Sequence, residues 1–236
     1  QFGAEARDPE RVLDAARGWT PETCADVEEM AALVRAFSRG GFEPVHGERV
    51  AIIGSGAAGL SAAHDLALMG FRPTVFEIEP VAAGMLAIGV PAYRLPRELI
   101  RREVAVIEAL GVTIRTGVEV GKDVSFAALR REHAAVVIAV GAKRARGLGL
   151  PGERGPRVYG GVDLLRAVSL GEPVDLGSEV IVIGGGNVAM DSARTALRLG
   201  AEKVYLIYRR SEKEMPARIE EVHHAKEEGV EFHWLT

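Results

Sequence analysis

Two glycine-rich turns constrain this chain more than any other feature of its sequence. Each follows a short run of β-branched and apolar residues, 50–53 and 180–183, and each precedes a helix-like stretch. The first reads Gly-x-Gly-x-x-Gly from Gly54, and the second reads Gly-x-Gly-x-x-Ala from Gly184. Glycines at these places allow a tight turn, a close approach of the backbone to a pyrophosphate, and close packing of the helix on the strand. The two turns predict two dinucleotide-binding units.

The residues around the two turns repeat one pattern. Both first helices are followed by a glycine at the same distance from the turn, Gly70 and Gly200, which marks an internal repeat. Alternating strands and helices predict parallel sheets covered by helices. We expect an α/β fold of two Rossmann-like units preceded by a short helical segment, with the second unit incomplete because about six strands would complete it. The expected strands are 50–53, 74–76, 112–115, 135–140, 179–183, 204–208 and 230–234, and the expected helices are 58–69, 97–110, 126–131, 188–199 and 217–228.

The residues after the second strand of each unit differ in charge. In the first unit Glu77 stands there, and a carboxylate at this place accepts hydrogen bonds from ribose hydroxyls and repels a 2′-phosphate. In the second unit Arg209 and Arg210 stand there, followed by Ser211, and guanidinium groups bind phosphate through paired hydrogen bonds. The second unit is therefore predicted to prefer NADP(H), and FAD is the simplest cofactor for the first. The alternatives are a plain connecting turn at Gly54 and ordinary surface charges at the two arginines.

Hydride transfer between a nicotinamide and a flavin requires that the two rings be brought together and water excluded, and it needs no acid or base from the protein. We therefore expect no catalytic residue of that kind and no metal site. His223 and His224 are adjacent in a highly charged stretch, so a solvated surface is the better interpretation of the pair. Ser61 stands in a sequence similar to a nucleophile elbow that lacks the final glycine, which excludes a serine hydrolase.

Composition excludes several classes of protein. Lys and Arg number 29 against 33 Asp and Glu, and the basic residues are scattered, so nucleic acid is not an expected partner. The single cysteine, Cys24, cannot form an internal disulfide or a Cys-x-x-Cys redox pair. The charge-free stretches 50–63 and 80–93 are broken by glycines and are shorter than the ~20 residues of a membrane span. The first residues carry no apolar signal segment, and a cytoplasmic location is expected.

Eight further stretches of the chain carry a family resemblance: 84–86, 89–96, 120–124, 139–141, 184–191, 208–211, 215–218 and 227–230. They resemble the pyridine nucleotide-disulfide oxidoreductase superfamily, and more closely its branch that contains the small (beta) subunit of NADPH-dependent glutamate synthase. The large subunit of NADH-dependent ferredoxin:NADP oxidoreductase has similar modules. Members commonly have a second glycine where this chain has Ala83, and a cysteine-rich lead region where it has Cys24 alone.

The resemblance implies which residues bind the cofactors and what the partner is. The partner would be an electron-accepting or electron-donating protein subunit of amidotransferase type, ferredoxin type or another iron-sulfur type. The implied FAD site comprises Gly54, Ser55, Gly56, Ala57, Ala58 and Gly59 at the pyrophosphate, Glu77 at the ribose, Gly84, Met85 and Leu95 nearer the flavin, Val120 at the adenine, and Ala139, Val140 and Gly141 at a chain crossover. The implied NADPH site comprises Gly185, Gly186, Asn187, Val188 and Ala189 at the phosphates, Arg209 and Arg210 at the 2′-phosphate, and Arg218 as a further candidate.

The expected domains are a helical lead-in over 1–48, an FAD-binding domain over 49–170, and the first half of an NAD(P)H-binding domain over 171–236. The chain starts at Gln1 rather than Met, and we expect it to be a piece of a longer protein. The implied function is an FAD-dependent NADPH oxidoreductase module that passes hydride between NADP(H) and FAD and relays electrons to a partner subunit or domain. The alternative is a non-catalytic assembly subunit, or a fragment, that retains the fold without a functional flavin.

Overall fold

The computed structural model describes residues 26–37, 47–145 and 147–235, which form two compact units. The first unit takes the described residues up to Leu86 together with Pro96–Gly141. The second takes Ala87–Leu95 and the described residues from Ala142 onward. Each unit therefore draws on two separate stretches of the chain.

The first unit is built on a four-stranded parallel sheet with the order β3-β2-β1-β4. Its strands are β1 (Arg49–Ile53), β2 (Arg72–Phe76), β3 (Thr113–Arg115) and β4 (Ala135–Ile138). Ile53 at the end of β1 pairs in register with Phe76 on one side and with Ile138 on the other. Because parallel strands end at one edge of the sheet, the residues that follow these three lie next to one another.

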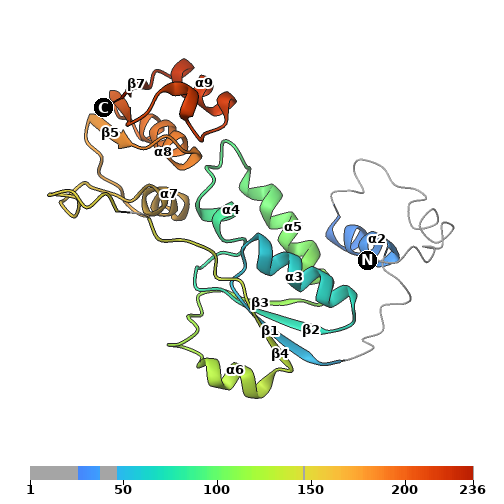
Figure 1. The fold of residues 1–236 in the computed structure, drawn as a ribbon. Helices are drawn as coiled ribbons and strands as arrows, with labels where there is room; N and C mark the ends of the chain where they lie inside the picture. Colours follow the sequence, from blue (N-terminus) through green and yellow to red (C-terminus); the bar gives the residue numbers. More distant parts are fainter. Residues whose placement is uncertain (1–25, 38–46, 146, 236) are drawn as a thin grey trace. The chain divides into compact units, whose positions relative to one another are not determined.

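Helices cover both faces of this sheet because its strands alternate apolar side chains between the two faces. Ile52 and Val75 point to the face that α3 (Ala57–Leu68) and α5 (Arg97–Ala109) cover, and α2 (Val27–Phe37) packs against α5 on the same side (Figure 1). Ala51 and Phe76 point to the opposite face, where they pack against α6 (Phe126–Glu132). A short helix, α4 (Met85–Ile88), follows the loop after β2.

The second unit has a three-stranded parallel sheet with the order β5-β6-β7. Its strands are β5 (Glu179–Ile183), β6 (Lys203–Tyr208) and β7 (Glu231–Trp234). The helices α8 (Asn187–Arg198) and α9 (Ile219–Glu227) pack on one face of it, and a 3-10 turn, η2 (Glu212–Glu214), precedes α9. On the other face the side chains of Ile181 and Ile183 are 62% and 55% exposed.

Helix α7 (Gly161–Leu170) packs so closely on α8 that a Cβ atom at Gly161 would lie 2.8 Å from Cγ1 of Val188 and 3.1 Å from Oγ of Ser192. Residues 142–170 therefore cluster with the second unit, although the sequence placed them in the first domain. Helix α7 itself was not among the helices predicted from the sequence.

The remaining predicted elements are present in the described residues, with small differences at their ends. Strand β4 is shorter than predicted because its partner β1 ends at Ile53, which pairs with Ile138. The predicted lead-in contributes α2, whereas residues 1–25 and 38–46, with Cys24 among them, lie outside the described part of the chain. Among the described residues, no helix has both the length and the apolar character needed to cross a bilayer.

Candidate functional site

The first glycine turn joins three neighbouring strand ends. The N–H of Gly54 donates to the carbonyl of Phe76 over 2.8 Å, and the N–H of Ala139 donates to the carbonyl of Ile53 over 2.8 Å. Gly54 has φ 101°, and a Cβ atom there would lie 2.4 Å from the carbonyl oxygen of Ala139. The fold itself therefore requires glycine at this position.

The other two glycines of the turn, Gly56 and Gly59, differ in the space that is available for a Cβ atom. A Cβ atom at Gly59 would lie 1.9 Å from the carbonyl oxygen of Gly54, so α3 packs directly on the turn. A Cβ atom at Gly56, the N-cap residue of α3, would meet no atom within 4 Å. The fold thus requires Gly54 and Gly59, whereas the side of Gly56 that a side chain would occupy is open. Ala57 and Ala58, in the first turn of α3, are also exposed.

The carboxylate of Glu77 is held against this turn by Ser55. Oε2 of Glu77 accepts from the N–H of Ser55 over 2.8 Å and from its hydroxyl over 2.6 Å, and Oε1 accepts from the N–H of Glu79 over 2.9 Å. The side chain of Glu77 is buried, with 2% of the residue exposed. Ser55, which the resemblance placed at a pyrophosphate, directs both of its hydrogen-bond donors to Glu77 instead. It therefore orients the predicted ribose-binding acid.

The loop after Glu77 returns to the turn at Ala83 and Gly84. The N–H of Ala83 donates to Oγ of Ser55 over 3.1 Å, and a Cβ atom at Gly84 would lie 2.9 Å from Cα of Gly56. Ala83 is buried and has φ 79°, a left-handed conformation that costs about 1–2 kcal/mol for a residue with a Cβ atom. This conformation gives a physical reason for the glycine that the family resemblance leads us to expect here. Met85, directly after Gly84, begins α4.

The remaining residues predicted for the first site are not all brought together. Val120 packs against the cluster formed by Ala51, Phe76 and Leu129, on the face covered by α6. Val140, two residues after the end of β4, is exposed. Leu95 belongs to the segment that clusters with the second unit, where its N–H donates to the carbonyl of Pro91 over 3.1 Å.

The second glycine turn is built in the same way, but its helix packs less closely on the turn at Ala189, the position that corresponds to Gly59. Gly184, at φ 141°, donates its N–H to the carbonyl of Ile207 over 3.0 Å. A Cβ atom at Gly185 would lie 2.6 Å from the ring of Tyr208, whereas one at Gly186, the N-cap residue of α8, would meet nothing within 4 Å. The Cβ atom of Ala189 lies 3.5 Å from the place where Gly184 would carry its own. Helix α8 therefore leaves room for alanine where α3 leaves none.

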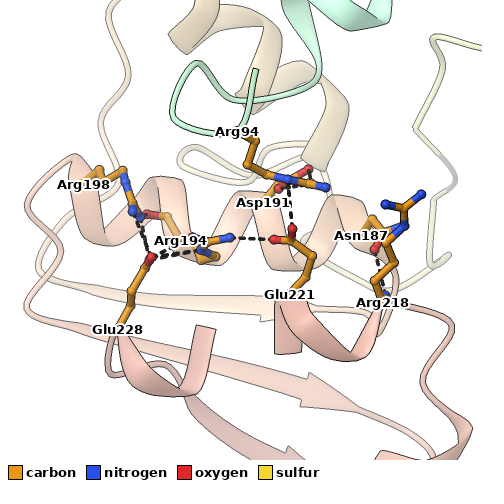
Figure 2. A network of polar contacts seen from close by, with 8 residues as sticks. All are labelled: Arg94, Asn187, Asp191, Arg194, Arg198, Arg218, Glu221 and Glu228. Carbon is orange, nitrogen blue, oxygen red and sulfur yellow. Dashed lines mark hydrogen bonds and ion pairs between the residues drawn. The ribbon is translucent and has the colours of Figure 1, made fainter. Parts of the chain in front are cut away.

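The loop before α9 is tied to this second turn. The N–H of Ala217 donates to the carbonyl of Gly185 over 3.1 Å, and the N–H of Arg218 donates to Oδ1 of Asn187 over 3.0 Å. Figure 2 shows Asn187 and Arg218 next to each other. Asn187 thus uses its side-chain oxygen to hold the loop, which places the exposed Arg218 beside the turn.

The loop after β6 carries the predicted phosphate-binding arginines. Arg209 and Arg210 are both exposed. The hydroxyl of Ser211 donates to Oε2 of Glu214 over 2.9 Å, and the N–H of Ser211 donates to the same oxygen over 3.1 Å. These two hydrogen bonds lower the pKa of Glu214. The hydroxyl that the sequence interpretation offered to a 2′-phosphate therefore caps η2, and the two guanidinium groups are the remaining candidates.

Sequence reasoning missed an ion-pair network on α8, which Figure 2 shows. Nη1 of Arg94 donates to both carboxylate oxygens of Asp191 over 2.7 and 2.8 Å, and its Nε pairs with Oε1 of Glu221 over 3.1 Å. The side chain of Asp191 is 7% exposed. Burial raises the pKa of Asp191, although the hydrogen bond from Arg94 opposes this effect. The signal in the sequence was Asp191 itself, a charged residue directly after the apolar residues 188–190, but its position does not identify its partner.

The network continues through two further arginines of α8 to a third carboxylate, Glu228 at the end of α9. Nη1 of Arg194 pairs with Glu221 over 2.6 Å, its Nη2 pairs with Glu228 over 2.8 Å, and Nη1 of Arg198 pairs with Glu228 over 2.6 Å. The hydrogen bonds from Arg198 and Arg194 lower the pKa of Glu228 to about 2. Three guanidinium groups of the network thus face three carboxylates.

The depressed pKa of Glu228 predicts an acid-dependent loss of stability. A carboxyl group with a pKa lowered on folding stabilises the native state above its ordinary pKa of 4.5, and this stabilisation is lost as the pH falls toward about 2. Chemical unfolding at pH 6 should show that Glu228→Gln lowers the free energy of unfolding by about 2 kcal/mol relative to the parent protein, a figure already reduced for partial solvent exposure. The difference should shrink steadily between pH 4.5 and pH 3.

The matched control for this experiment is Glu98→Gln. Glu98 pairs with Arg101 and Arg102 on the exposed side of α5, so its replacement should change the free energy of unfolding by less than about 0.5 kcal/mol. A Glu228→Gln difference that is the same at pH 6 and pH 3 would contradict the lowered pKa of Glu228.

Comparison with known proteins places the chain in a family. The family model of the pyridine nucleotide-disulphide oxidoreductases matches residues 48–236. The NADP(+)-dependent formate dehydrogenase subunit beta of Moorella thermoacetica is 48% identical over 92% of the chain, which spans 30% of that protein. The glutamate synthase [NADPH] small chain of Azospirillum brasilense is 40% identical over 80% of the chain, which spans 42% of that protein.

The solved structures agree with the fold. A structure of Mycobacterium tuberculosis FprA in complex with NADPH matches with a TM-score of 0.68 at 24% identity, over 78% of this chain and 48% of FprA. The chain spans less than half of each of these relatives. The predicted α/β fold and the predicted resemblance are both confirmed, and the chain belongs to the pyridine nucleotide-disulphide oxidoreductase family.

Proposed function

We propose that this chain is the part of an NADPH-dependent flavoprotein that binds FAD in its first unit and NADP(H) in its second. The observation that carries the proposal is the pair of N-cap glycines, Gly56 and Gly186. Each is open on the side where a Cβ atom would stand, and each follows, two residues earlier, a glycine with a positive φ. Two helix N-termini with an open approach suit two pyrophosphate groups, because backbone N–H groups and the helix dipole favour anions there.

In the first unit, Glu77 is the residue that would select the cofactor. Its carboxylate is fixed by Ser55 and by the N–H of Glu79, and an ionised carboxylate only accepts hydrogen bonds. It therefore suits ribose hydroxyls and disfavours a 2′-phosphate. The open side of Gly56 and the exposed residues Ala57 and Ala58 would face the pyrophosphate of FAD. Leu95 and Val120 stay proposed contacts of the flavin and the adenine.

In the second unit, the arginines would select NADP(H). Arg209 and Arg210 are exposed after β6, where a 2′-phosphate is expected, and Arg218 is held beside the glycine turn by Asn187. Bound together, the two cofactors would supply the chemistry, which is transfer of hydride between nicotinamide and flavin. The residues of this chain bind and orient them, and we propose no acid, base or metal from the chain. Among the described residues, no group of three or more potential ligands could hold a metal ion.

The partner of the whole protein would be a further redox subunit. The relatives from M. thermoacetica and A. brasilense carry the names subunit beta and small chain, which supports an assembly with other subunits. We propose that electrons pass to or from such a subunit, of amidotransferase type, ferredoxin type or another iron-sulfur type. We also propose the cytoplasm as its location, where NADPH is supplied.

A visible spectrum of the purified full-length protein tests this function. The expected result is a flavin absorption band that bleaches under anaerobic conditions on addition of NADPH, and much more slowly with the same concentration of NADH. A colourless protein that still binds its partner subunit would overturn the proposal and support the assembly role instead.

A further inference from the structure

The segment Ala87–Leu95 belongs to the second compact unit, although the chain on both sides of it belongs to the first. The chain therefore passes from one unit to the other after Leu86, after Leu95 and after Gly141. A single connection leaves two units free to reorient. Three connections restrict that freedom only if the inserted segment is firmly held by the unit with which it clusters.

Arg94 is the side chain that holds this segment. Its guanidinium donates to both oxygens of Asp191 on α8 and pairs with Glu221 on α9, so one planar group binds carboxylates from two helices. Figure 2 shows Arg94 reaching from its own loop to these two side chains. Because Asp191 and Glu221 are 7% and 12% exposed, water competes little for the pairing.

The neighbouring Tyr93 strengthens the same attachment. Its ring lies against the guanidinium of Arg198 at 3.9 Å and that of Arg194 at 4.7 Å. Both arginines are fixed in turn by Glu228. Two consecutive residues of the segment thus contact the same stretch of α8, one through charge and one through its ring.

We infer that Arg94 is a positioning residue for hydride transfer, because it makes the inserted segment part of the nicotinamide-binding unit. This inference rests on the function proposed above. Gly84 and Met85, which are implied to lie near the flavin, precede the segment with only Leu86 between them and it. Holding the segment in place therefore shortens the unattached chain between Met85 and the nicotinamide-binding unit to about one residue. Orientation of reacting groups contributes strongly to rate.

Hydrogen exchange in the full-length protein tests the attachment directly. In Arg94→Gln, peptides that cover residues 87–95 should exchange at least about tenfold faster, whereas peptides that cover β5 and β6 keep their rates. Arg94→Lys retains the charge but not the planar fork and should give an intermediate rate. The matched control is Arg101→Gln, which removes an exposed guanidinium on α5 and should leave residues 87–95 unchanged. Unchanged exchange of this segment in Arg94→Gln would overturn the inference.

Kinetics separates positioning from a merely structural role. In Arg94→Gln, the limiting rate of flavin reduction at saturating NADPH should fall about tenfold, while the Kd of NADP+ changes less than about threefold. A variant that loses NADP+ affinity at an unchanged limiting rate would overturn the inference. If the parent protein itself is not reduced by NADPH, the proposed function fails, and the exchange experiment still decides whether Arg94 anchors the segment.

Discussion

Gly59→Ala is expected to lower the free energy of unfolding of the first unit by about 3 kcal/mol. The added Cβ atom would lie 1.9 Å from the carbonyl oxygen of Gly54 and 3.0 Å from its carbonyl carbon. Both are backbone atoms, so no change of rotamer relieves the overlap, and α3 must move away from β1. Chemical unfolding of the full-length protein, followed by a probe in the first unit, measures the change.

Gly56→Ala is the matched control for this experiment. Gly56 has φ −64°, which alanine adopts without strain, and its Cβ atom would meet nothing within 4 Å. We expect the free energy of unfolding to stay within about 0.5 kcal/mol of the parent, and the Kd of FAD to rise at least about tenfold because the methyl group occupies the proposed pyrophosphate approach. Parent-like stability of Gly59→Ala would contradict the close packing of α3. Parent-like FAD binding by Gly56→Ala would contradict the assignment of the site.

Replacing Arg209 and Arg210 together by alanine is expected to raise the Kd of NADPH about 100-fold. Each charge-assisted hydrogen bond to phosphate contributes roughly 1.5 kcal/mol at an exposed position, and two such groups would meet the 2′-phosphate. NADH lacks that phosphate, so its Kd should change less than about threefold. Isothermal titration calorimetry of the purified protein with each nucleotide gives the Kd of NADPH and the Kd of NADH.

The control for this pair is the double replacement of Arg101 and Arg102 by alanine. It removes the same charge from α5 of the first unit and should leave both nucleotide affinities within about twofold, because neither residue belongs to the proposed NADP(H) site and exposed charges are screened by salt. Equal losses of NADPH and NADH affinity in the Arg209 and Arg210 variant would contradict a role in recognising the 2′-phosphate.

The parts of this structure that follow from local sequence were predictable. A β-branched run followed by a glycine turn and an apolar helix has one common arrangement, which explains why β1, α3, β5 and α8 lie where the pattern indicated. The position of Glu77 was predictable for the same reason, since the end of β2 must lie beside the end of β1 in a parallel sheet.

The features that depend on packing between distant residues were not predictable from the sequence. Nothing near Arg94 indicates that its partners are Asp191 and Glu221, because a charge pattern records neighbours on one helix and not contacts between separate segments. The clustering of residues 142–170 with the second unit was not predicted for a similar reason, because it depends on the packing of Gly161 on α8. Ser55 also has a role that only its distance to Glu77 shows.

The apolar face of β5 has a practical consequence for handling this part of the protein. Strand β5 stands at one end of the three-stranded order, and Ile181 and Ile183 are largely exposed on its sheet. An edge strand with uncovered β-branched side chains is a template on which another chain can add a strand. We therefore expect preparations of residues 1–236 alone to self-associate at this edge as their concentration rises. A further strand paired with β5, or the substitution Ile181→Lys, should keep them monomeric.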